Sequence, residues 1–77
     1  MEMTKFIQLF AEQFDDVDAS TLTPESNFRD IEEWSSLVAL SVIAMVDEEY
    51  GVLLKGDDIR QSNTIADLYS NVQSKTH

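Results

Sequence analysis

Apolar residues recur at intervals of three and four along this sequence, and that spacing restricts the chain to helices. In the stretch TKFIQLFAEQF the pattern is carried by Phe6, Leu9, Phe10 and Phe14. Because an α-helix has 3.6 residues per turn, residues spaced in this way lie on one face. The pattern predicts a helix over residues 4–15, with Thr4 as its N-cap.

A second helix is predicted to begin at Ser35 or Ser36 and to end at Tyr50. Serine caps helix N-termini well, and Gly51 can adopt the left-handed conformation that ends many helices. An ideal wheel places on the core side Leu40, Ile43, Val46 and Tyr50, with Ala39 beside them. The opposite side carries Val38, Ser41, Met45 and Glu48, with Leu37 and Ala44 on its flank. Apolar atoms are therefore expected on the solvent side of this helix.

Two further segments complete the predicted fold. GDDIRQS can hold only a short helical turn, whereas Thr64 and Asp67 form a capping box for a last helix, whose apolar stripe is Ile65, Leu68 and Val72. Residues 15–34 contain the only proline and few apolar residues, so they are expected to form a long loop over the core. The sequence thus predicts a single all-α domain over residues 1–77, a small four-helix bundle of three main helices and one short helix, with this long loop between the first two.

The residue types present exclude most metal and disulfide chemistry. The chain has no cysteine, and its one histidine, His77, is the last residue. Asp16 and Asp18 have the spacing of a calcium loop, but Thr21 stands where that loop needs glycine and Asn27 where it needs glutamate. No metal site is expected, and a cysteine-free chain fits a reducing, cytoplasmic setting.

The charge balance limits the kinds of molecule that this chain can bind. Fifteen acidic residues against five basic ones give a net charge of −10. This charge disfavours nucleic acid and anionic membranes and favours proteins with basic surfaces. No apolar run approaches the roughly 20 residues that span a bilayer, and the N-terminus lacks the layout of a signal peptide. We expect a soluble monomer without membrane insertion.

The tripeptide SSL occupies residues 35–37, at the predicted start of the second helix. Phe28 precedes it, and DEEYGV and TIADL follow it. This combination resembles the acyl carrier proteins, a family of small acidic helical bundles that carry a phosphopantetheine arm on the serine of a DSL motif. The resemblance implies a carrier that is not an enzyme and that presents acyl intermediates, held as thioesters, to enzymes of fatty-acid, lipid or secondary-metabolite biosynthesis.

The resemblance places the arm on Ser36, with Ser35 as the minor candidate. It implies that a phosphopantetheinyl transferase attaches 4′-phosphopantetheine from coenzyme A. A phosphodiester at a helix start would lie near backbone N–H groups and the positive end of the helix dipole. A nucleophilic serine would instead need a base, and His77 is an unsuitable candidate. The reading in which both serines only cap the helix stays open.

One position departs from the family pattern. The family has aspartate before the modified serine, where it helps to hold a metal ion during transfer, and this chain has Ser35. The departure implies slower modification or a dedicated transferase.

The second helix is also the expected docking surface for enzymes with basic surfaces. Its docking residues are predicted to be Leu37, Val38, Ser41, Met45, Asp47, Glu48 and Glu49. The resemblance further implies that part of the acyl chain withdraws among Leu40, Ile43, Val46 and Ile65. Trp34 is expected to pack across the junction of loop and helix. The alternative function is an unmodified acidic helical interaction module that binds a protein through Val38 and Met45.

Overall fold

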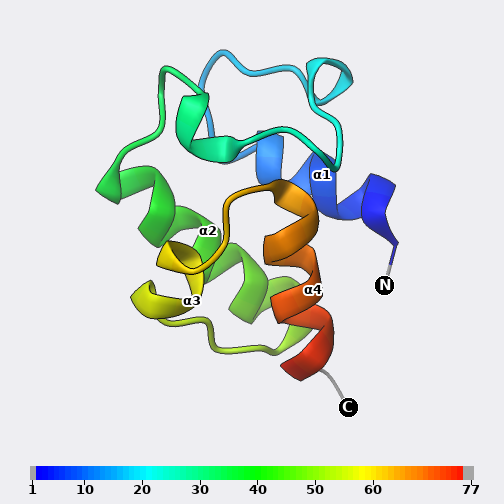
Figure 1. Cartoon of the computed structure of the whole chain (residues 1–77), viewed down its shortest axis with the longest axis vertical. Helices are drawn as coiled ribbons and strands as arrows, with labels where there is room; N and C mark the ends of the chain where they lie inside the picture. The colour runs from blue at the N-terminus through cyan, green and yellow to red at the C-terminus, as the bar shows by residue number, and fades with distance from the viewer. Residues whose placement is uncertain (1, 76–77) are drawn as a thin grey trace.

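Four helices and two short 3₁₀ turns make up the computed structural model, which describes residues 2–75 (Figure 1). The helices are α1 (Met3–Ala11), α2 (Ser36–Tyr50), α3 (Gly56–Arg60) and α4 (Ile65–Lys75), and the 3₁₀ turns are η1 (Ala19–Thr21) and η2 (Phe28–Asp30). Helix α1 packs against α2 and α4, and α3 packs against α4. The predicted all-α bundle, with one short helix and a long loop between the first two helices, is confirmed.

Helix α1 is shorter than the sequence predicted. It ends at Ala11 rather than at residue 15, and its N-cap is Glu2 rather than Thr4. The chain turns away because the Glu33 carboxylate accepts hydrogen bonds from the backbone N–H groups of Asp15 and Asp16, both at 3.2 Å. A turn after the helix still brings the Phe14 side chain into the core.

The predicted ends of α2 and the start of α4 are confirmed. Gly51 follows α2 with a φ of 65°, the left-handed conformation that glycine adopts without steric cost. Before α4, the Asp67 N–H donates to Thr64 Oγ1 and the Thr64 N–H donates to Asp67 Oδ2, each at 3.1 Å. Hydrogen bonds from the Thr64 and Asn63 N–H groups stabilise the Asp67 carboxylate and hold its pKa below the ordinary value.

The core lies among all four helices and under the long loop. Its side chains with no exposed surface include Phe6, Phe10, Phe28, Val42, Val46, Ile65, Leu68 and Val72. Trp34 lies between the loop and α2, with its ring centroid 4.8 Å from that of Phe28 and 6.3 Å from that of Phe10. The prediction that the loop folds over the core, with Trp34 packed at its junction with α2, is therefore confirmed.

The helical wheel of α2 was wrong at two positions. Met45, predicted to lie on the solvent side, is only 6% exposed, whereas Leu40, predicted to face the core, is 62% exposed. The buried face of α2 includes Val42, which lies about 200° around the helix from Leu40, so the two cannot both point inward. Because α2 carries apolar residues on all sides, its sequence did not indicate which face packs against the other helices.

Candidate functional site

The two serines at the start of α2 have different structural roles. Ser35 is the N-cap, and its Oγ accepts a hydrogen bond from the Val38 N–H at 3.3 Å. Ser36 is the first residue of the helix and is exposed, and its hydroxyl makes no hydrogen bond within residues 2–75. Of these two serine hydroxyls, only that of Ser36 is therefore exposed and without a hydrogen-bond partner in the described residues.

The backbone around Ser36 suits an anion. The first N–H groups of a helix have no partner within the helix, and the N-terminus carries the positive end of the helix dipole. Ser35 satisfies the Val38 N–H, but no acceptor lies within the described residues for the N–H groups of Ser36 and Leu37. A negatively charged group on the Ser36 oxygen would lie close to these two donors.

A groove of about 540 Å³ opens beside Ser36, between α2 and α3. We call it the α3 groove, and its lining residues are Trp34, Ser35, Ser36, Ala39, Leu40, Ile43, Gly56, Ile59 and Arg60. The groove includes Leu40 and Ile43, two of the four residues expected to line an acyl site. The other two, Val46 and Ile65, have no exposed surface and do not line this groove, so their part in an acyl site among the helices stays a prediction.

Arg29 holds the α3 wall of this groove in place from the loop before α2. Its Nη2 donates hydrogen bonds to the carbonyl oxygens of Ile59 at 2.9 Å and Arg60 at 2.7 Å, and its Nη1 donates to Asn63 Oδ1 at 2.8 Å. The last carbonyl groups of a helix lack partners within the helix. The Ile59 carbonyl also accepts from the Ser62 N–H at 3.1 Å, and Arg29 adds a charged donor that complements the negative end of α3. These contacts span 30 to 34 residues, and the sequence pattern did not indicate them.

A buried polar contact joins the same wall to α4. The Ser62 side chain has no exposed surface, and its Oγ donates to the Asp58 carbonyl at 2.9 Å. Asn71 Nδ2 donates to Ser62 Oγ at 2.7 Å. Because a buried hydroxyl is costly without partners, these bonds fix the chain after α3 against α4.

A second groove, of about 410 Å³, lies on the other side of the α2 N-terminus. We call it the acidic groove, and its lining residues are Gln13, Phe14, Asp15, Glu33, Ser35, Leu37, Val38 and Ser41. It brings together three of the predicted docking residues: Leu37, Val38 and Ser41. Asp47, Glu48 and Glu49 are exposed near the far end of α2, outside this groove, and the burial of Met45 removes it from the surface.

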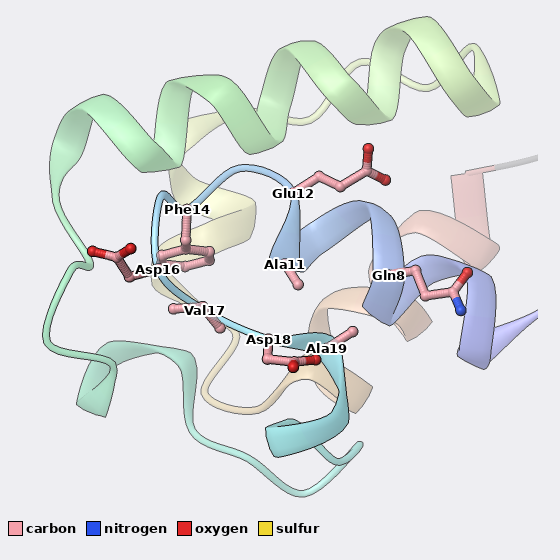
Figure 2. Close-up of a pocket in the computed structure, with 8 residues that line it drawn as sticks. All are labelled: Gln8, Ala11, Glu12, Phe14, Asp16, Val17, Asp18 and Ala19. Carbon is pink, nitrogen blue, oxygen red and sulfur yellow. The ribbon is translucent and has the colours of Figure 1, made fainter.

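A third hollow lies at the end of α1 (Figure 2), and Ser36 is not among the residues that line it. It is lined by Gln8, Ala11, Glu12, Phe14, Asp16, Val17, Asp18 and Ala19. Figure 2 shows the carboxylates of Glu12, Asp16 and Asp18 pointing in different directions. Asp18 instead caps η1, since its Oδ1 accepts from the Ser20 N–H at 2.9 Å. Across residues 2–75, no group of three acidic, histidine or cysteine side chains is placed to hold a metal ion.

A family model described as a phosphopantetheine attachment site matches residues 4–72 of the chain. The chain belongs to this family. It is a phosphopantetheine carrier, and its cofactor is covalently attached 4′-phosphopantetheine. Carriers of this family are typically not catalytic, and they interact with phosphopantetheinyl transferases and biosynthetic enzymes. A search of curated proteins found no match to this carrier.

The residues at the start of α2 fit the arm of such a carrier. Ser36 offers an exposed hydroxyl, the adjacent N–H groups can stabilise a phosphodiester, and the α3 groove opens beside it. The sequence motif predicts Ser36 and Leu37 as site residues, but it gave no sign of Arg60, which lines the groove, or of Arg29, which bonds to the backbone of α3. No helix within the described residues is long and apolar enough to cross a membrane.

Proposed function

We propose that Ser36 is the residue that carries the arm, and that this carrier presents acyl intermediates as thioesters to enzymes of fatty-acid, lipid or secondary-metabolite biosynthesis. The observation that carries the proposal is the contrast between the two serines. Ser35 uses its side-chain oxygen to cap α2, whereas the Ser36 hydroxyl is exposed and makes no hydrogen bond. The arm supplies a thiol, which this cysteine-free chain lacks.

The chain's own part in this function is to offer and orient the attachment oxygen. Ser36 lies on a rigid element, because α2 is capped at Ser35 and ends at Gly51. No histidine lies within residues 2–75, so a transferase must provide the base that takes the Ser36 proton. The N–H groups of Ser36 and Leu37 then stabilise the new phosphodiester.

Partner enzymes are proposed to dock on α2, which supports both apolar and electrostatic contacts. Leu37 is 76% exposed, and Val38 and Ser41 lie beside it in the acidic groove. The acidic end of α2, with exposed Asp47, Glu48 and Glu49, favours basic surfaces. With a net charge of −10, the whole chain also steers such partners toward it.

The attachment site is tested by loading the apo carrier with a broad-specificity phosphopantetheinyl transferase and coenzyme A. Intact mass should show one added arm on the parent and on Ser35→Ala, and none on Ser36→Ala. Ser35→Ala is the matched control, because it loses a cap worth about 1 kcal/mol yet keeps the Ser36 hydroxyl. Circular dichroism verifies that both variants are helical.

Two outcomes would contradict the proposal. If Ser36→Ala is loaded as well as the parent, the arm is attached elsewhere. If the folded parent accepts no arm from any transferase tried, and intact mass of the protein isolated from its host shows none either, the chain acts as an unmodified acidic interaction module.

A further inference from the structure

The α3 groove has one charged side chain in its lining, and that side chain is a cation. Arg60 lines the groove together with Ser36, in a chain with only five basic residues against fifteen acidic ones. The acidic groove on the other side of α2 contains no basic residue and two carboxylates, those of Asp15 and Glu33. The start of α2 therefore lies between a groove that attracts anions and a groove that repels them.

The guanidinium of Arg60 is free to change partner. Its Nη2 contacts Asp57 Oδ1, but both side chains are more than 70% exposed, and exposed ion pairs are weak. Its Nη1 lies 3.5 Å from the position that a Cβ would take on Gly56, so the guanidinium folds back over the first turn of α3. Exchanging the Asp57 carboxylate for another anion in the groove would cost little.

The main chain of Arg60, in contrast, is fixed. Its carbonyl oxygen accepts a hydrogen bond from Arg29 Nη2 at 2.7 Å, and the preceding carbonyl, that of Ile59, accepts from the same nitrogen at 2.9 Å. A fixed backbone with an exposed, planar donor suits recognition of a phosphate, because a guanidinium can donate two parallel hydrogen bonds to its oxygens.

We infer that Arg60 binds the phosphodiester of the arm attached to Ser36 and so directs the arm into the α3 groove. This inference rests on the proposed attachment at Ser36. The phosphodiester carries one negative charge, which Arg60 and the α2 N-terminus attract and which Asp15 and Glu33 repel. Binding leads the arm past the apolar side chains of Leu40 and Ile43 and leaves the acidic groove to partners.

The test measures the unfolding midpoint of the apo and holo carrier, with and without Arg60→Gln, at low salt. Attachment of the arm should raise the unfolding midpoint by about 2–5 °C more in the parent than in Arg60→Gln. An exposed charge pair contributes up to about 1 kcal/mol, which corresponds to a shift of this size. This difference should shrink at 1 M salt, where the Debye length is about 3 Å. Lys5→Gln is the matched control: it removes the same charge from α1, away from the groove, and should keep the parental difference.

A spectroscopic measurement reports on the contact directly. The ¹⁵N resonance of the Arg60 side chain should shift between apo and holo carrier, and Arg60→Lys should retain part of the stability difference. Suppose that intact mass shows one arm on the parent and none on Ser36→Ala, but that the arm changes neither the midpoint difference nor the Arg60 resonance. The inference is then wrong while the attachment site stands. Failure to load Ser36 would instead overturn the attachment proposal on which the inference depends.

The anion could also come from the cargo. A carboxylate at the end of an acyl group would give the same pairing, so holo carrier with a free thiol is compared with carrier loaded with a neutral acyl group and with a dicarboxylic acyl group. If the midpoint difference between the parent and Arg60→Gln is already present with the free thiol, the result supports the phosphodiester as the anion that Arg60 binds. A difference that arises only with the dicarboxylic group overturns that assignment.

Discussion

Replacing Arg29 should loosen α3 and destabilise the whole carrier. Its guanidinium makes three hydrogen bonds, to the carbonyl oxygens of Ile59 and Arg60 and to Asn63 Oδ1. Bonds from a charged donor contribute about 1.5–3 kcal/mol each when buried, but these are largely exposed and contribute less. We expect Arg29→Gln to lower the free energy of unfolding by about 1–3 kcal/mol in total, which corresponds to about 5–20 °C in a domain of this size.

The measurement is urea unfolding followed by the fluorescence of Trp34, whose ring lies 4.8 Å from that of Phe28, the neighbour of Arg29. Arg29→Lys keeps the charge but not the planar fork, so it should recover less than half of the loss. Lys5→Gln removes an equal charge from a residue outside these contacts and should change stability by less than about 0.5 kcal/mol. If Arg29→Gln has the same urea unfolding midpoint as the parent, Arg29 does not hold α3 in place.

Four further substitutions test other parts of the fold and surface. Gly51→Ala should cost about 1 kcal/mol in urea unfolding, because an ideal Cβ there meets no atom within 4 Å and the whole cost comes from the φ of 65°; an unchanged midpoint would contradict this. Asp67→Asn should be less stable than the parent at neutral pH, and the difference in unfolding free energy should close as pH falls below the ordinary carboxyl pKa of 3.8. The reason is that the hydrogen bonds that lower the Asp67 pKa stabilise the fold only while the carboxylate is ionised. A stability difference that stays constant in acid would refute this origin. For docking, Leu37→Ala should speed dissociation of a partner enzyme at any salt concentration, whereas Glu48→Gln should slow association only at low salt. If both variants bind with the rate constants of the parent, partners dock on a surface other than α2.

The helix boundaries that the sequence predicted correctly depend on neighbouring residues. Gly51 ends α2 through its own conformation, and Thr64 and Asp67 lie three residues apart and bond to each other. The end of α1 was missed because it depends on Glu33, which accepts hydrogen bonds from the N–H groups of Asp15 and Asp16, 18 and 17 positions earlier in the chain. A local pattern contains no signal for such a contact, and the same reason explains why Arg29 was not predicted.

The geometry of the candidate site could be predicted only in part, for a similar reason. The SSL motif and the helix start indicated Ser36, since a helix N-terminus is encoded locally. Which face of α2 is buried was not encoded locally, because apolar residues surround the helix and only the packing of α1 and the other elements selects Val42 and Met45. Of the predicted docking residues, Met45 is therefore buried, whereas docking through Leu37 and Val38 stays a prediction.

Helix α2 is anchored in the core by Val42, Met45 and Val46, whereas two leucines in its first half are exposed. Val42 and Val46 have no exposed surface, whereas Leu37 and Leu40 are 76% and 62% exposed. Burying one such leucine contributes about 1.5–3 kcal/mol, so two exposed leucines on one half-helix represent stability that the free protein does not gain. Leu40 lies in the α3 groove beside Ser36, and Leu37 lies in the acidic groove. Their exposure is explained if each is covered only during function, Leu40 by the arm and its cargo and Leu37 by the enzyme that receives them.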